Sequence, residues 1–262
     1  MLLNNINPIL LDLGPLTIRW YGLFLGIGIM ITSWIIIKLF KKEDLEEDLA
    51  LSLIIYLFIG GIIGARLGHI LFYEIGYYLT YPIEVFFINH GGLSSHGLTL
   101  GLLITFTLFV KIKKINWKQV LDLVVIPLPI LIIFIRLGNF FNSEIVGRAT
   151  DLPWAISYPL YELNPIPRHP SQIYEILLAL VIFIIIFLVY KKRDCFVPRN
   201  DNKKQRPLFL FNIFLLLYFS SRFLIEFTKE FQTLSPDFIL TMGQLLSLPF
   251  IVWSVFWLYK NK

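Results

Sequence analysis

Long apolar runs recur along the whole chain, and they constrain its fold more than any other feature. A helical span across a bilayer needs about 20 predominantly apolar residues, and several segments of this chain approach or exceed that length. Charged residues make up only 16% of the 262 residues, against about 25% in ordinary soluble domains. The sequence therefore predicts an all-α, polytopic membrane protein with about seven transmembrane helices. The expected spans are Thr17–Phe40, Leu49–Tyr73, Gly97–Ile112, Val120–Ile135, Gln172–Tyr190, Leu208–Phe227 and Ile239–Tyr259.

The distribution of basic residues predicts how these spans are oriented. Most of the 23 lysines and arginines fall in segments that an alternating path of spans places on one side. The positive-inside rule makes that side cytoplasmic, so the N-terminus is expected outside and the C-terminus in the cytoplasm. We expect residues 1–262 to form a single integral membrane domain. It would have an outer cap at 138–171, between the fourth and fifth spans, and a polar cytoplasmic loop at 191–206.

The basic residues expected in the outer half or outside are mostly arginines. A guanidinium group can bind a phosphate or a carboxylate through two parallel hydrogen bonds, whereas an ammonium acts as a point charge. The outer set therefore favours an anion-binding role, with pairing to structural carboxylates as the alternative. Its members are Arg19, Arg66, Arg136, Arg148, Arg168 and Arg222, together with Lys229.

The segment Arg136–Arg148 is the most suggestive part of the chain. It follows directly on the apolar run Val120–Ile135 and contains Asn139, Glu144 and Gly147. Charge beside a hydrocarbon span is costly, so such residues are functional candidates.

Three other places add candidates. Tyr218, Arg222 and Glu226 are spaced by four, which places them on one helix face, and a local Arg–Glu pair is the alternative role. His96 enters the third span beside a glycine and is a candidate base near neutral pH. Arg66 lies within the second span and must face protein, water or a polar ligand.

Neither a metal site nor a cysteine nucleophile is expected. The only cysteine, Cys195, lies in a charged segment away from the other candidates. His169 and Glu175 lack the His-Glu-x-x-His spacing of a helical zinc site. No metal and no cofactor are predicted.

In sequence order, these motifs resemble those of the prolipoprotein diacylglyceryl transferase family. Arg136 to Gly147 matches the pattern Gly-Arg-x-Gly-Asn-Phe-x-Asn-x-Glu-x-x-Gly, with Ile135 where a glycine is usual. Ser95 and Lys229 also depart from the family, which often has an aromatic residue and an arginine there. The other matching segments are Arg19–Gly22, Gly64–Gly68, Gly91–Gly97, His169–Glu175 and Tyr218–Phe227.

The resemblance implies an enzyme of the bacterial inner membrane with its site toward the outer side. It would transfer diacylglyceryl from phosphatidylglycerol to the lipobox cysteine of a preprolipoprotein and release glycerol phosphate. It also implies that Arg136 binds phosphatidylglycerol and that Arg222 is essential. Other matched positions implicated in activity are Tyr21, His96, Asn139, Glu144, Gly147 and Tyr218.

These residues suggest a mechanism as a hypothesis. His96 is the candidate base for the cysteine thiol, with Tyr218 as a competing or assisting proton carrier. Arg136 and Arg222 would stabilise the departing phosphate, with Asn139 orienting the headgroup. The alternative function is a lipid or anion transporter or flippase; no internal repeat typical of transporters is visible in the sequence.

Overall fold

The structure is a computed structural model that describes residues 2–14, 17–87, 91–196, 207–230 and 240–261. Most of the predicted cytoplasmic loop (197–206) lies outside the described residues, as does Ile239. The chain divides into two compact units, which are described separately. Unit 1 comprises Met1–Ile35 and Lys118–Lys262, and unit 2 comprises Ile36–Trp117.

Within the described residues, six helices are long and apolar enough to cross a membrane, or up to seven if one bent pair counts as a span. This confirms the predicted all-α polytopic class. The helices are α1 (Trp20–Lys42), α2 (Glu47–Phe72), α4 (Ser95–Lys113), α7 (Ser171–Phe196), α8 (Phe209–Ile225) and α9 (Met242–Lys260).

The fourth predicted span is wrong as a single helix. It consists of α5 (Trp117–Val124) and α6 (Leu128–Phe141), which meet at an angle of 45°. Pro127 sits at the break, where it offers no N–H to a preceding turn and disfavours helical geometry in the residue before it. Helix α6 then continues past Ile135, so Arg136 lies inside a helix rather than beyond its end.

The start of the first span is also wrong by three residues. Thr17–Arg19 form strand β3, which pairs antiparallel with β2 (Ile9–Asp12) before α1 begins at Trp20.

In unit 2, glycines allow close packing of α2 against α4. A Cβ added to Gly64 would lie 2.6 Å from both the Gly97 carbonyl oxygen and the Gly101 Cα. Small residues of this kind allow helix backbones to approach closely in membranes, where lipid offers no hydrophobic drive for association. After α2 the chain forms the short helix α3 (Ile75–Thr80) and the 3-10 helix η1 (Pro82–Phe86).

In unit 1, α6 packs against α7, α7 against α8, and α8 against α9. The first half of α1 packs on α6 through Gly28, where an added Cβ would meet Phe134 at 2.8 Å. At the far end from the cap, Asp122 of α5 accepts a hydrogen bond from the Phe211 N–H of α8 at 2.9 Å. A carboxylate at the first turn of a helix is favoured by the helix dipole.

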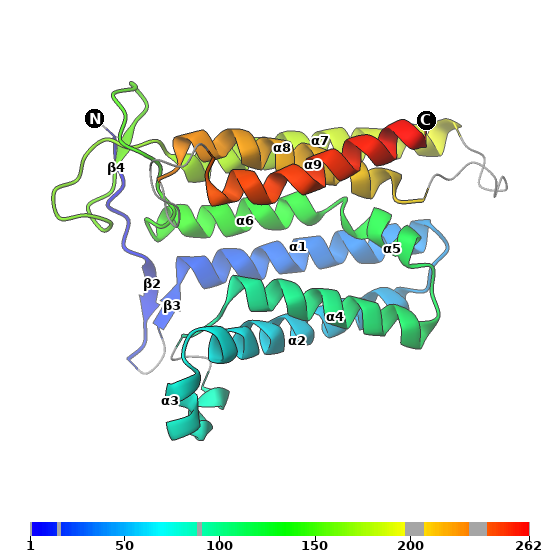
Figure 1. Cartoon of the computed structure of the whole chain (residues 1–262), viewed down its shortest axis with the longest axis horizontal. Coiled ribbons are helices and arrows are strands. Elements are labelled where there is room, and N and C mark those ends of the chain that lie inside the picture. Colours follow the sequence, from blue (N-terminus) through cyan, green and yellow to red (C-terminus); the bar gives the residue numbers. More distant parts are fainter. Residues whose placement is uncertain (1, 15–16, 88–90, 197–206, 231–239, 262) are drawn as a thin grey trace. The chain divides into compact units, whose positions relative to one another are not determined.

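The segment 142–170 between α6 and α7 forms a cap at one end of unit 1 (Figure 1). Its strand β4 (Ile156–Ser157) pairs in parallel with β1 (Leu2–Leu3), which ties the start of the chain to the cap. Val146, Ile156 and Tyr158 form a small core that Phe140 and Ile173 complete from the two flanking helices. The cap is thus packed onto the helix ends that carry the candidate site.

Arg168 fastens the cap to the segment after α8. Its guanidinium is bound to both Glu162 oxygens at 2.7 and 2.9 Å, and it also pairs with Glu230. The Tyr161 hydroxyl donates to Glu230 at 2.7 Å. These hydrogen bonds from Arg168 hold the pKa of Glu162 below its usual value. Of the outer arginines, Arg168 thus fits the alternative of pairing with structural carboxylates.

The glycine contact between α2 and α4 gives a first prediction. Gly64→Ala should destabilise the protein by about 1–3 kcal/mol, because the new methyl group meets backbone atoms that cannot rotate away. Thermal unfolding in detergent measures the effect. Gly26→Ala in α1 is the matched control, since among the described residues no heavy atom lies within 4 Å of its added Cβ. Equal melting temperatures for the two variants would contradict the packing argument.

The Arg168 cluster predicts a pH-dependent stability. Because the pKa of Glu162 is lowered on folding, its ionised form stabilises the fold above the unfolded value of about 4.3. That contribution is lost as pH falls through the folded pKa. Glu162→Gln should therefore lower the melting temperature at pH 7, and the difference from wild type should close as pH drops below about 4. A difference that stays constant with pH would show that Glu162 does not act through its charge.

Candidate functional site

A single carboxylate, Glu175, lies at the centre of the charged residues in unit 1. It projects from the second turn of α7, and its side chain is only 10% exposed. One oxygen lies 2.6 Å from the Arg136 Nε of α6, and the other lies 2.6 Å from the Lys229 Nζ. The Arg222 guanidinium of α8 lies 3.9 Å from the same carboxylate. Three cations from three segments therefore share one anion.

Arg222 makes a second ion pair on its own helix face. Its Nη2 lies 3.6 Å from Glu226, one turn further along. This confirms the local Arg–Glu pair expected from the spacing of four. Gly243 of α9 faces the same carboxylate, because an added Cβ there would lie 2.6 Å from the Glu226 Cδ. Arg222 keeps 29% of its side chain exposed, the largest fraction among these cations.

From Arg136 a chain of hydrogen bonds runs to the end of α6. Arg136 Nη1 donates to Asn139 Oδ1 at 3.1 Å, and Asn139 Nδ2 donates to Glu144 at 3.1 Å. Asn142 Nδ2 donates to the other Glu144 oxygen, also at 3.1 Å. The amide groups of the Arg136–Gly147 signature thus connect its arginine to its carboxylate.

The turn that carries Glu144 is strained on both sides. Ser143 and Ile145 have φ angles of 55° and 56°, a conformation that is unfavourable for a β-branched residue such as Ile145. The start of α7 holds the turn in place: Ser171 Oγ donates to the Ile145 carbonyl and Gln172 Nε2 to the Glu144 carbonyl, each at 2.6 Å. Backbone strain that its surroundings over-determine in this way is typical of functional sites.

Gly147 lets two backbones meet beside the ion pairs. An added Cβ would lie 2.6 Å from both the His169 and the Thr228 carbonyl oxygens, so a side chain does not fit. Its neighbour Arg148 donates its backbone N–H to the Thr228 carbonyl at 2.8 Å, and its side-chain Nε donates to the Lys229 carbonyl. Burial lowers the pKa of Lys229, and the charge of Glu175 opposes that shift.

Tyr21 approaches the same helix end. The first turn of α1 lies so close to Gly138 that an added Cβ would meet the Tyr21 ring at 2.6 Å. Trp20 packs beside it on Phe141, with ring centroids 5.2 Å apart. Gly138 therefore provides the space in which Tyr21 sits near Arg136 and Asn139.

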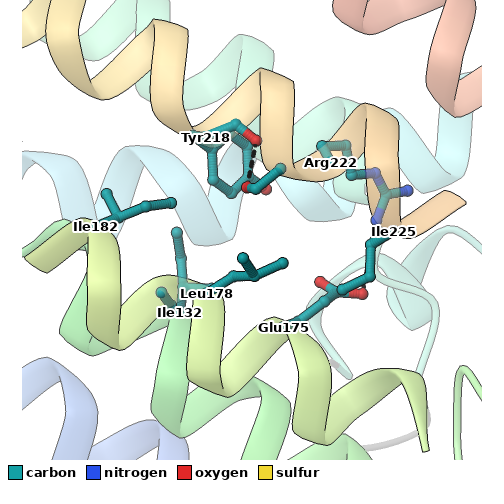
Figure 2. A pocket seen from close by; sticks show the side chains of 9 residues that line it. Ile132, Glu175, Leu178, Ile182, Tyr218, Arg222 and Ile225 are labelled. Atoms are coloured by element: carbon teal, nitrogen blue, oxygen red, sulfur yellow. Dashed lines mark hydrogen bonds and ion pairs between the residues drawn. The ribbon is translucent and has the colours of Figure 1, made fainter.

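A pocket opens between α6, α7 and α8 next to the ion pairs. Figure 2 shows Glu175 and Arg222 at one end, Tyr218 above and Ile132, Leu178 and Ile182 along the apolar part. The cavity is small, with a volume of about 20 Å³, and it is open to the surface. Charged groups thus stand at one end of a small opening whose other lining residues are mostly apolar.

Two of the predicted site residues, Arg66 and His96, belong to unit 2. The Arg66 side chain makes five hydrogen bonds, all to backbone carbonyls of Glu84, Val85, Phe87, Gly91 and Gly92. It therefore organises the connection from η1 to α4. His96 is exposed in the first turn of α4, two residues after the N-cap Ser94, whose Oγ accepts from the Gly97 N–H at 3.2 Å.

Sequence reasoning did not select two residues that the structure places at the centre of the charges. In the sequence, Glu175 stands out as a zinc ligand to be weighed with His169 and as the end of the matching segment His169–Glu175. The His169 ring instead contacts the Tyr174 hydroxyl at 3.2 Å. The sequence places Lys229 in the outer basic set and marks it as a departure from the family's arginine, but does not single it out as a site residue. A sequence signal did exist for Glu175, because it is a lone carboxylate at the mouth of an apolar run, where an ionised group needs a partner.

Comparison with known proteins gives one consistent result. Residues 8–260 match the family model described as prolipoprotein diacylglyceryl transferase. Relatives carrying the name phosphatidylglycerol–prolipoprotein diacylglyceryl transferase include one from Chloroherpeton thalassium, 39% identical over 98% of this chain and 93% of the relative. Another, from Bacteroides fragilis, is 36% identical over 97% of this chain and 93% of its own.

These matches favour the transferase over the transporter that the sequence alone left open. They extend over nearly the whole chain and are not confined to the apolar spans, which any membrane protein shares. The chain belongs to the prolipoprotein diacylglyceryl transferase family.

Proposed function

We propose that this enzyme transfers the diacylglyceryl group of phosphatidylglycerol to the thiol of the lipobox cysteine in a preprolipoprotein. The family membership supports the reaction class. The observation that carries the site assignment is the group of Arg136, Arg222 and Lys229 around Glu175, next to an apolar pocket. Phosphatidylglycerol has a phosphodiester that joins an apolar diacylglycerol to a polar glycerol. Cations beside apolar side chains suit a ligand of that kind.

The reaction forms a carbon–sulfur bond and breaks a carbon–oxygen bond. The cysteine sulfur attacks the glycerol carbon that carries the phosphate, and glycerol phosphate leaves with the electron pair of that bond. Arg136 and Arg222 bind the phosphate oxygens and stabilise the charge they gain, because preorganised cations act most strongly where water is excluded. Asn139 orients the Arg136 guanidinium, and Glu144 in turn holds Asn139.

The thiol must lose a proton for attack, since its free pKa is near 8.5. His96 is the proposed base. Tyr218, which lines the pocket beside Arg222, is the competing or assisting carrier. Tyr218 belongs to unit 1 and His96 to unit 2, and the pH–rate profiles of their variants distinguish the two roles.

We place the site toward the outer side of the bacterial inner membrane. The support is the distribution of basic residues along the sequence, most of which an alternating path of spans places on the cytoplasmic side. The signal peptide of a preprolipoprotein would then present its cysteine to the site from the membrane. No cofactor is needed for this displacement, because a phosphate monoester is a stable anion that can leave with the electron pair of the carbon–oxygen bond.

The reaction is tested with purified protein, phosphatidylglycerol and a lipobox peptide. Mass spectrometry should show a peptide gain of one diacylglyceryl group. Arg136→Ala should reduce this product by at least about a hundredfold, while the protein still inserts and remains folded. Gly26→Ala is the activity control. Near-normal product with Arg136→Ala would remove Arg136 from phosphate binding, and absence of product with folded wild type would overturn the transferase function.

The base is tested by the pH–rate profile. With His96 as base, the wild-type rate should rise with pH across the range in which histidine side chains lose their proton. His96→Asn should remove that limb and lower the rate by about 10²–10⁴-fold. Tyr218→Phe is the comparison variant. A limb that persists in His96→Asn and is lost in Tyr218→Phe would assign the proton transfer to Tyr218.

A further inference from the structure

The charged residues at the site carry a small net charge. The ion pairs described above join three cations, Arg136, Arg222 and Lys229, to two carboxylates, Glu175 and Glu226. The excess is a single positive charge. Glu175 has the largest share in this balance, because Arg136, Arg222 and Lys229 all lie against it.

We propose that Glu175 is a specificity-determining residue that matches the site to a singly charged phosphodiester and against a doubly charged phosphomonoester. The proposal rests on the function proposed above and deepens it. A phosphodiester lipid carries one negative charge, whereas the glycerol phosphate that leaves is a monoester. Its second pKa of about 6 makes it largely a dianion at neutral pH.

Two energies with different charge dependence produce this preference. The attraction between a ligand and a fixed set of site charges grows in proportion to the ligand charge. The cost of removing the ligand from water grows with the square of its charge in the Born description. A partly buried site with one excess positive charge therefore compensates a monoanion better than a dianion.

Burial makes the desolvation cost relevant here. The side chains of Arg136, Glu175 and Lys229 are 14%, 10% and 4% exposed, and the neighbouring pocket wall is apolar. At a fully solvated surface the two ligands would differ little in this respect, because water screens both.

The charge of Glu175 should also affect how readily the phosphate product is released. As the carbon–oxygen bond breaks, the bound phosphate changes from diester to monoester and gains negative charge. Arg136 and Arg222 favour that gain in the transition state, while Glu175 prevents the finished dianion from being held tightly. The carboxylate thus separates stabilisation of the departing group from retention of the product.

The test uses two soluble headgroup ligands that differ in charge and in one glycerol group, and it compares their ratio between variants so that the constant difference in size cancels. Glycerophosphoglycerol is the monoanionic diester, and glycerol phosphate is the monoester. Each displaces phosphatidylglycerol labelled on an acyl chain from the full-length purified protein at pH 8, followed by fluorescence. Wild type should prefer the diester. Glu175→Gln should shift the ratio of the two displacement constants toward the monoester by about tenfold, as removal of one nearby negative charge requires.

Three further variants separate charge from structure. Glu175→Asp keeps the charge and should keep the wild-type ratio, even if its shorter reach lowers activity. Glu226→Gln removes another carboxylate beside Arg222 and should shift the ratio in the same direction. This variant takes the place of Glu175→Gln if the latter is not recovered folded. Glu47→Gln removes a carboxylate that pairs with Lys41 in unit 2 and should leave the ratio unchanged.

The outcomes are distinguishable from those of the transfer assay. An unchanged ratio in folded Glu175→Gln, or an equal shift in Glu175→Asp, would overturn the charge-matching role. If Glu175→Gln is not recovered, an unchanged ratio in Glu226→Gln has the same meaning. Displacement measures binding and needs no transfer reaction. The ratios of displacement constants can therefore be interpreted whether or not the lipobox peptide gains a diacylglyceryl group. Failure of the peptide reaction would instead count against the transferase function.

Discussion

The ion pair between Arg136 of α6 and Glu175 of α7 is the interaction on which the arrangement of the site depends. A buried charge is costly without a partner, and removing one member of a buried pair leaves the other uncompensated. Here the carboxylate also receives Lys229 and lies near Arg222 of α8. The three segments are therefore held in register at one end by charge, whereas their apolar faces alone would allow them to slide.

Local backbone features hold these charges in place. The close approach at Gly147 brings the cap beside Lys229, and the strained turn around Glu144 is held by Ser171 and Gln172. Next to the charges lies a small, mostly apolar opening between α6, α7 and α8. Unit 2 has its own organising residue, Arg66, whose five bonds to carbonyls define the connection that leads to α4 and His96.

The sequence predicted the membrane class and most helices, because a hydrocarbon core demands long apolar runs that are directly visible. It missed the bend at Pro127 and the continuation of α6 through Arg136, since the polar residues there resemble the end of a span although their side chains bind one another. The signature motif identified Arg136, Asn139 and Glu144 together. Glu175 was not selected, because its role arises from cations 39 residues before it and 47 and 54 after it, and only folding brings these together.

We propose that the lipid phosphate binds between Arg136 and Arg222, in exchange for part of their contact with Glu175. The most direct test is an experimental structure of the enzyme with phosphatidylglycerol bound. The account predicts phosphate oxygens within about 3 Å of both guanidinium groups, with the acyl chains along Ile132, Leu178 and Ile182. A headgroup bound elsewhere, with the Arg136–Glu175 pair undisturbed and Arg222 unengaged, would contradict it.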